Sequence, residues 1–207
     1  MAKMIKIIPF ISSSFSSNVY LLKAKKITLI DVGMEPENLL KKLKKEINLK
    51  DLNLIILTHN HPDHTLALPF LLKETRAKVA IHKDELTSKT KSIMGFPIPE
   101  IKPDLILNGG EKINLGDFSL DVIHTPGHTS GSICLYQDRI LFSGDTIFAG
   151  GNIGRTDLGG DNKDLLSSIK KLTDLNVEMV YPGHGEIITM NAREEILSSF
   201  RLAKDCQ

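Results

Sequence analysis

Residues 58–64 read Thr58-His59-Asn60-His61-Pro62-Asp63-His64 and directly follow the apolar run Leu54-Ile55-Ile56-Leu57. Three of the chain's 7 histidines and one aspartate therefore stand within a few positions of each other. Neutral imidazole and carboxylate are good ligands for borderline divalent metals. His59 and His61 lie two positions apart, so an extended segment or tight turn points both the same way. The stretch predicts metal binding in preference to a polar loop with chance histidines.

The composition is that of an ordinary globular protein, and it excludes several function classes. The chain has 207 residues, of which 41% are hydrophobic and 25% charged, with a formal net charge of +1. A charge this close to zero gives no global field that would favour nucleic acid. No stretch approaches the ~20 apolar residues of a membrane span. We expect one domain over residues 1–207, a small-molecule substrate as partner, and a homodimer as an open alternative to the monomer.

Cysteine usage and the N-terminus predict a reducing compartment. The chain has 2 cysteines, Cys134 and Cys206, so a disulfide framework is not indicated. The apolar run within residues 1–10 is short and broken by Pro9, which is unlike a signal peptide. We expect a cytoplasmic protein.

The hydrophobic pattern predicts strands and helices without strict alternation. Strands are expected over residues 5–8, 18–22, 26–31, 54–57, 79–82, 112–115, 119–124, 132–137, 139–143 and 177–181. Helices are expected over residues 36–49, 66–74, 83–91, 164–172 and 193–204, and residues 94–103 are expected to be irregular because they hold three prolines. This order suggests an α/β (α+β) fold with two sheets and helices outside them, a four-layer sandwich.

Three further polar clusters each follow an apolar strand. His128 ends the run 124–128, Asp145 follows strand 139–143, and His184 follows strand 177–181. Alone, each residue would more often be a hydrogen-bonded structural group or a turn cap. Ligands at the ends of strands that share a sheet edge converge in space, so the three residues are predicted to join the first cluster.

The chain resembles the metallo-β-lactamase-fold hydrolases over nearly its whole length. The matching residues are the run 59–64, then His128, Asp145 and His184, and the runs 125–129 and 144–150 look most like glyoxalase II (hydroxyacylglutathione hydrolase). The resemblance implies an αββα fold and two divalent metal ions, Zn²⁺ first with Fe²⁺ or Mn²⁺ as alternatives. It places one ion on His59, His61 and His128 and the other on Asp63, His64 and His184, with Asp145 bridging them.

This ligand set implies hydrolysis without a protein nucleophile. Two divalent ions that share a water lower its pKa toward about 7, and the resulting hydroxide attacks a carbonyl. Asp63 is the expected catalytic residue, because it can accept a hydrogen bond from that hydroxide. An acyl thioester is the expected substrate. Only a short stretch follows His184, so the glutathione-gripping helical domain of glyoxalase II is expected to be absent, and the carrier thiol stays open.

Other functions remain open at this stage. An iron persulfide dioxygenase would use His59, His128 and Asp145 on one iron. A lactonase or phosphodiesterase would use the full metal pair on another substrate. A non-catalytic metal-binding scaffold is disfavoured, because no ligand of the set is missing.

Three residues are candidates for substrate binding. Arg155 ends a loop that directly follows Asp145, so it is expected near the pocket, where it could meet a substrate carboxylate. The alternative is an internal ion pair with Asp157 or Asp161. Phe15 and Phe96 are expected at the mouth of the metal site or at a dimer interface beside it, and the alternative is burial in the core.

Overall fold

The computed structural model describes residues 5–87 and 92–207, and its first half is built on a six-stranded sheet. The strand order is β1-β2-β3-β4-β5-β8. The strands are β1 (Lys6–Phe10), β2 (Val19–Lys23), β3 (Ile27–Ile30), β4 (Leu52–Ile56), β5 (Lys78–His82) and β8 (Leu105–Leu107). Because β3, β4, β5 and β8 run parallel, their carboxyl ends meet at one edge of the sheet.

A five-stranded sheet in the order β15-β12-β11-β10-β9 forms the second half. Its strands are β9 (Lys112–Asn114), β10 (Ser119–His124), β11 (Ile133–Gln137), β12 (Ile140–Gly144) and β15 (Met179–Pro182). Strands β12 and β15 are parallel, so the residues that follow them also emerge at a shared edge.

Helices cover the outer face of each sheet. They are α1 (Pro36–Glu46) and α3 (Leu68–Glu74) over the first sheet and α4 (Asn162–Thr173) and α5 (Ala192–Asp205) over the second, while the short helix α2 (Pro62–Thr65) follows the loop after β4. Helix α1 begins with Pro36 in its first turn and buries Leu39 and Leu43, which stand four apart on one face. Helix α4 begins at Asp161, whose carboxylate accepts hydrogen bonds from two backbone N–H groups of the first turn.

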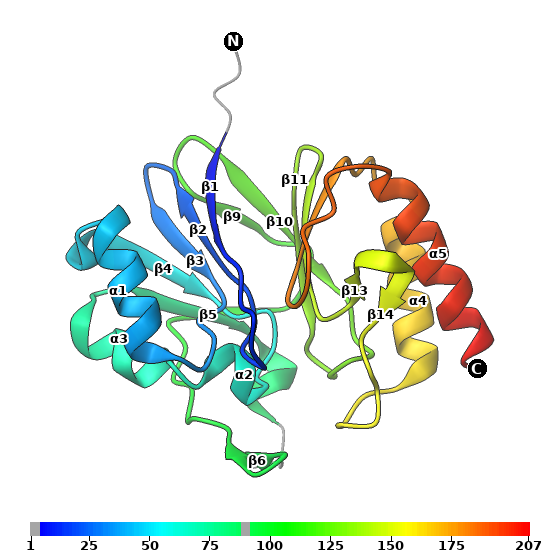
Figure 1. The fold of residues 1–207 in the computed structure, drawn as a ribbon, viewed down its shortest axis with the longest axis horizontal. Helices are drawn as coiled ribbons and strands as arrows, with labels where there is room; N and C mark the ends of the chain where they lie inside the picture. The colour runs from blue at the N-terminus through cyan, green and yellow to red at the C-terminus, as the bar shows by residue number, and fades with distance from the viewer. Residues whose placement is uncertain (1–4, 88–91) are drawn as a thin grey trace.

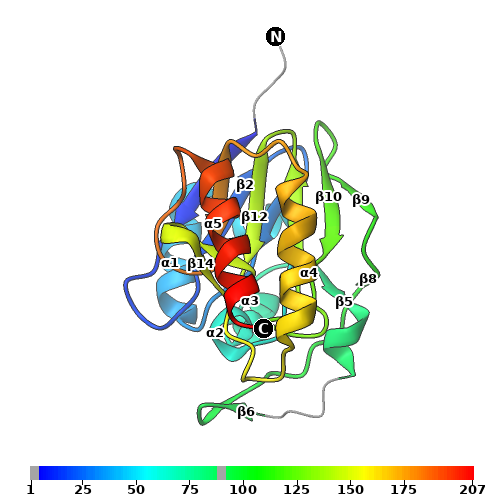
Figure 2. The same cartoon turned by 90° about the vertical axis from the view of Figure 1, so that its right-hand side faces the viewer.

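Three hydrophobic clusters separate four layers. One packs α1 and α3 against the first sheet, the second fills the space between the two sheets, and the third packs α4 and α5 against the second sheet. Figure 1 shows this order across the molecule, and Figure 2 shows α4 and α5 side by side over the outer face of the second sheet. The four-layer αββα fold is confirmed.

Several local predictions were wrong. The expected helix over 83–91 is a short 3-10 turn, Lys83–Leu86, and residues 88–91 lie outside the described part of the chain. The segment expected to be irregular contains part of a hairpin of β6 (Ser92–Ile93) and β7 (Phe96–Pro97). Strand β8 and the small pair β13 (Ile147–Phe148) and β14 (Asn152–Ile153) were not predicted. These strands are two or three residues long, too short for a periodic pattern.

Among the helices of residues 5–87 and 92–207, none has the length and apolar character needed to cross a bilayer.

Candidate metal centre

The loop after β4 carries the first group of candidate ligands, and a buried carboxylate shapes it. Asp31 Oδ1 accepts a hydrogen bond of 2.8 Å from the Thr58 backbone N–H, and its Oδ2 accepts one of 2.8 Å from the Thr58 hydroxyl. Asp31 follows β3 directly and has a positive φ of 55°. The ends of two parallel strands are thus joined where the histidines begin.

His59, His61 and His128 form the first cluster, with one nitrogen of each lying within 4.8 Å of the others. All three are buried. His61 Nδ1 and His128 Nε2 are 2.9 Å apart. The other ring nitrogen of His128, Nδ1, donates to the Arg155 carbonyl at 2.6 Å, which leaves Nε2 free to act as a ligand.

Asp63, His64, Asp145 and His184 form the second cluster, again with ligand atoms within 4.8 Å. His184 Nε2 lies 2.9 Å from Asp63 Oδ2 and 3.3 Å from His64 Nε2. His64 Nδ1 donates to Asp31 Oδ2 at 2.8 Å, which turns its Nε2 toward the cluster, 3.2 Å from Asp145 Oδ1. Asp31 therefore serves both the ligand loop and the second cluster.

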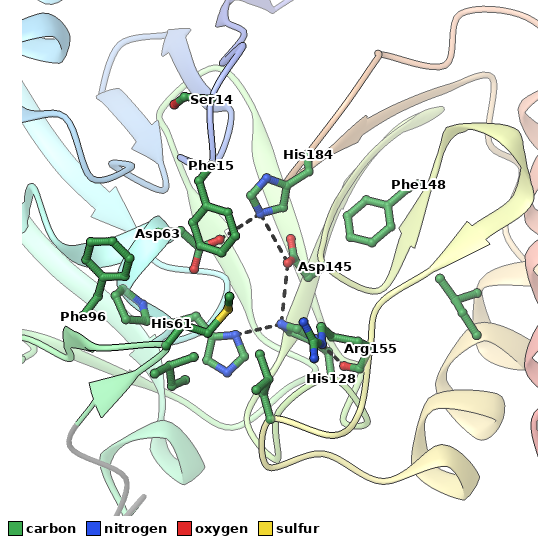
Figure 3. A pocket seen from close by; sticks show the side chains of 15 residues that line it. Ser14, Phe15, His61, Asp63, Phe96, His128, Asp145, Phe148, Arg155 and His184 are labelled. Atoms are coloured by element: carbon green, nitrogen blue, oxygen red, sulfur yellow. Dashed lines mark hydrogen bonds and ion pairs between the residues drawn. The ribbon is translucent and has the colours of Figure 1, made fainter.

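Asp145 stands between the two clusters. Its Oδ2 is 3.5 Å from His128 Nε2 and 3.5 Å from His184 Nε2, as the dashed lines in Figure 3 show. Close packing fixes the carboxylate, because a Cβ on Gly183 would lie only 2.1 Å from Asp145 Oδ1. A carboxylate with one face toward each cluster is suited to bridge two cations.

The electrostatics of four candidate ligands suit metal binding, and the surrounding carboxylates, Asp145 first, raise the pKa of a fifth, His64, against its burial. Burial lowers the pKa of His59 far below its ordinary value and that of His61 to about 3, so both are neutral. Although burial opposes it, nearby histidines, His64 first among them, lower the pKa values of Asp63 and Asp145. His59 Nε2 and Asp145 Oδ1 are buried without a hydrogen-bond partner. Buried acceptors without a hydrogen bond, one in the three-histidine cluster and one in the histidine–aspartate cluster, fit a pair of divalent cations.

A cavity of about 400 Å³ opens over this metal centre. Five of the seven residues line it directly: His61, Asp63, His128, Asp145 and His184. Its walls include the three residues proposed from the sequence for substrate binding, Phe15, Phe96 and Arg155. Figure 3 shows Phe15 and Phe96 on one side of the ligands and Phe148 on the other.

Comparison with known proteins agrees with this geometry. Residues 14–184 match the family model described as "Metallo-beta-lactamase superfamily".

The chain belongs to the metallo-beta-lactamase superfamily.

Curated relatives in the superfamily carry hydrolase names. A "Probable metallo-hydrolase MJ0888" of Methanocaldococcus jannaschii is 38% identical over 188 residues, which cover 84% of this chain and 89% of the relative. "Hydroxyacylglutathione hydrolase GloC" of Haemophilus influenzae is 35% identical over 202 residues, covering 90% and 92%. The chain therefore groups with metallo-hydrolases of its own length.

Two solved structures match most of the chain. The BLEG-1 B3 metallo-beta-lactamase superposes with a TM-score of 0.78 at 35% identity and covers 92% of this chain and 96% of that one. TTHA1623, crystallised in a di-iron-bound form, gives a TM-score of 0.74 at 32% identity, covering 88% and 94%.

Two buried carboxylates that support this metallo-beta-lactamase site were not found from the sequence. Asp31 is one. The feature of the sequence that could have indicated it is an acidic residue directly after an apolar strand. Glu85 is the other. Its Oε2 accepts from the Asn60 backbone N–H at 2.9 Å, and its Oε1 accepts from the Thr129 hydroxyl at 2.6 Å and the Gly131 N–H at 2.8 Å. Glu85 thus ties the loop of His59 and His61 to the loop of His128.

The structure also bears on the two roles predicted for Arg155, an internal ion pair and a position at the substrate pocket. Its guanidinium makes a bidentate pair with Asp157, with Nε 2.7 Å from Oδ1 and Nη2 2.5 Å from Oδ2. The same residue lines the cavity. Arg155 therefore combines the internal ion pair with a place beside the metal centre.

Proposed function

We propose that this protein is a metal-dependent hydrolase that acts on acyl thioesters. The observation that carries the proposal is the cavity over a three-histidine cluster and a histidine–aspartate cluster, with Asp145 between them. A relative named hydroxyacylglutathione hydrolase, 35% identical over 90% of the chain, supports the thioester as the substrate class.

Zinc is the metal we propose for both clusters. Neutral imidazoles and carboxylates without thiolates suit Zn²⁺, and they also suit iron and manganese. The di-iron form of TTHA1623 is a reason to include iron in any reconstitution. His59, His61 and His128 would hold one ion, Asp63, His64 and His184 the other, and Asp145 would contact both.

Bound divalent ions would supply Lewis acidity, activating water and polarising the thioester carbonyl. The chain's own groups orient the reacting parts. Asp63 is half-buried, faces the cavity, and accepts at Oδ2 from His184. We assign its carboxylate the role of accepting a hydrogen bond from the attacking water, which fixes the direction of attack. The Arg155 carbonyl and Asp31 hold the rings of His128 and His64 in one tautomer each.

Two measurements test the proposal. Metal analysis of the purified protein should find two divalent ions per chain, and the loaded protein should hydrolyse a simple acyl thioester. Asp63→Asn should lower kcat by about 100-fold or more and weaken binding of the second ion, whereas Asp51→Asn, an exposed control, should change neither.

The competing activities predict different readouts. A persulfide dioxygenase would consume oxygen with a single iron per chain, and it would have no need of the complete second cluster seen here. A lactonase or phosphodiesterase would share the metal content but prefer its own substrate in a parallel screen. Oxygen uptake with a persulfide, or a lactone or phosphodiester turned over faster than every thioester, would overturn the proposal.

A further inference from the structure

One side of the cavity is framed by apolar side chains from two distant segments. Phe15 comes from the loop between β1 and β2, and Phe96 comes from the hairpin of β6 and β7. Their ring centroids lie 6.4 Å apart with an interplanar angle of 23°. Ile93 and Met94 of the same hairpin also line the cavity. The two segments together form one apolar wall beside the metal centre.

These side chains are unusually exposed for apolar groups. Phe15, Phe96 and Met94 have exposed fractions of 55%, 40% and 60%. Apolar surface gains free energy when it is removed from water, at roughly 25 cal/mol per Å². A ligand with an apolar group that covers this wall would therefore gain binding free energy from the contact. Aromatic rings and a thioether are also well suited to contact another ring.

The opposite wall is apolar down to the second cluster. The Phe148 ring lies 6.2 Å from the His184 ring, centroid to centroid. Ile153 and Leu158 also line the cavity. A substrate carbonyl placed over the ligands would thus have apolar surface on both sides.

Among the described residues that line the cavity, the one basic side chain outside the metal centre is already paired with a carboxylate. Apart from the metal centre, Arg155 is the one charged residue among the described residues that line the cavity. Asp157 pairs with the Nε–Nη2 edge of that guanidinium, and these hydrogen bonds raise the pKa of Arg155. A carboxylate bound between these walls would lose water, and among the described wall residues it would meet only a guanidinium that Asp157 already pairs at one edge.

We propose that the cavity selects thioesters whose acyl group is apolar and uncharged, and that it disfavours acyl or thiol parts with a carboxylate close to the scissile bond. The inference rests on the proposed hydrolase function and narrows it. Glutathione carries two carboxylates, so its thioesters fall in the disfavoured class. In the selected substrates, any charged group of the thiol carrier lies far from the scissile thioester bond. Such a group stays outside the apolar walls of the cavity.

Matched thioesters of one neutral thiol test the acyl preference. Phenylacetyl- and succinyl-N-acetylcysteamine differ in the charge of the acyl end, and S-lactoylglutathione tests the charged thiol. With the metal-loaded protein, kcat/KM for the phenylacetyl compound should exceed that for the other two by about tenfold or more. Equal rates, or faster hydrolysis of the succinyl or glutathione compound, would overturn the inference.

Two variants probe the walls and the charge separately. Phe96→Ala should reduce the phenylacetyl-to-succinyl ratio by roughly tenfold. Phe70→Ala is the matched control, because Phe70 is 45% exposed and does not line the cavity. Asp157→Asn should release Arg155 and raise kcat/KM for the succinyl thioester several-fold. If Phe96→Ala and Phe70→Ala shift the ratio alike, or Asp157→Asn leaves it unchanged, the assigned walls or the neutralised cation are wrong.

A binding measurement separates this inference from the proposed function. S-phenethyl-N-acetylcysteamine and its S-(2-carboxyethyl) counterpart are thioethers that cannot be hydrolysed, and calorimetry can measure the binding of both to the metal-loaded protein. The phenethyl compound should bind at least about tenfold more tightly. Tight, selective binding with no thioester hydrolysis would refute the hydrolase and keep the apolar cavity. Hydrolysis of thioesters without selective binding would keep the hydrolase function and refute the apolar selectivity of the cavity.

Discussion

The metal centre and the cavity walls above it are built in opposite ways. In the metal centre, His59, His64 and Asp145 are buried, and hydrogen bonds from both halves of the chain hold the rings in place. In the walls, Phe15 and Phe96 are largely exposed, and their described ring partners are each other.

This difference separates chemistry from selectivity. A change in the metal centre leaves buried polar groups unpaired, so it affects metal content, stability and turnover together. A change in the walls removes surface that is already in contact with water, so it costs little stability. Substrate preference can therefore vary in this fold while the reaction chemistry stays the same.

Removing the central carboxylate should have the largest effect. Asp145→Ala takes away the one group that faces both clusters. We expect the loss of at least one metal ion per chain and a fall in kcat/KM of about 1,000-fold or more. Metal analysis and steady-state kinetics on the same preparation measure both. If this variant kept full metal content and full activity, the assignment of Asp145 as a metal ligand would be wrong.

The next largest effect should come from a residue that does not line the cavity over the metal centre. Asp31→Asn replaces a carboxylate that accepts from Thr58 and from His64 Nδ1. We expect metal affinity to fall by about 10–100-fold. Competition with a chromogenic chelator gives the affinity, and Asp51→Asn serves as the exposed control. An affinity equal to that of the control would show that the orientation of His64 does not depend on Asp31.

Glu85 tests whether the two ligand loops must be tied together. Glu85→Gln puts an amide N–H against one of the three donors now bound by the carboxylate. We expect a loss of about 1–3 kcal/mol in the free energy of unfolding and weaker metal binding at the first cluster. Denaturant titration against Glu74→Gln, an exposed control, measures the stability term. A loss of stability with unchanged metal affinity would assign Glu85 to the fold alone.

The smallest effect on stability should come from the wall. Arg155→Ala removes an exposed side chain whose ion pair with Asp157 is open to solvent. The melting temperature should stay at the wild-type value, because exposed ion pairs contribute little. The backbone carbonyl that holds His128 remains, so kcat for a neutral thioester should change by less than about threefold. A large drop in melting temperature would place Arg155 with the structural residues.

The sequence predicted the parts of the molecule that repeat a pattern or bring together unusual residues. The layer order followed from the order of the strands and of the helices with one apolar face, such as the face of α1 that holds Leu39 and Leu43. The seven candidate ligands stood out because histidines and aspartates followed strand ends. Their roles as ligands stay a prediction, as do the single domain, the homodimer and the cytoplasmic location.

The supporting residues had no such signal. Asp31 and Glu85 are single acidic residues, and the chain contains 25 of that type. Their importance depends on burial and on which backbone N–H groups face them, and both are properties of the folded chain. Short strands such as β7 and β14, two residues each, likewise depend on their partners across the hairpin. The double role of Arg155 also required the structure, because both of its candidate partners were acidic neighbours.

The contact between His184 and Asp63 has a consequence for how the protein folds. The two residues are 121 positions apart in the chain, and each follows a strand of a different sheet. Contacts this distant form late, since the entropy of closing the intervening loop must be overcome first. Both sheets must dock before the second cluster exists, so stable metal capture reports the completion of folding. During refolding, the uptake of the second ion should coincide with the slowest phase seen by other probes.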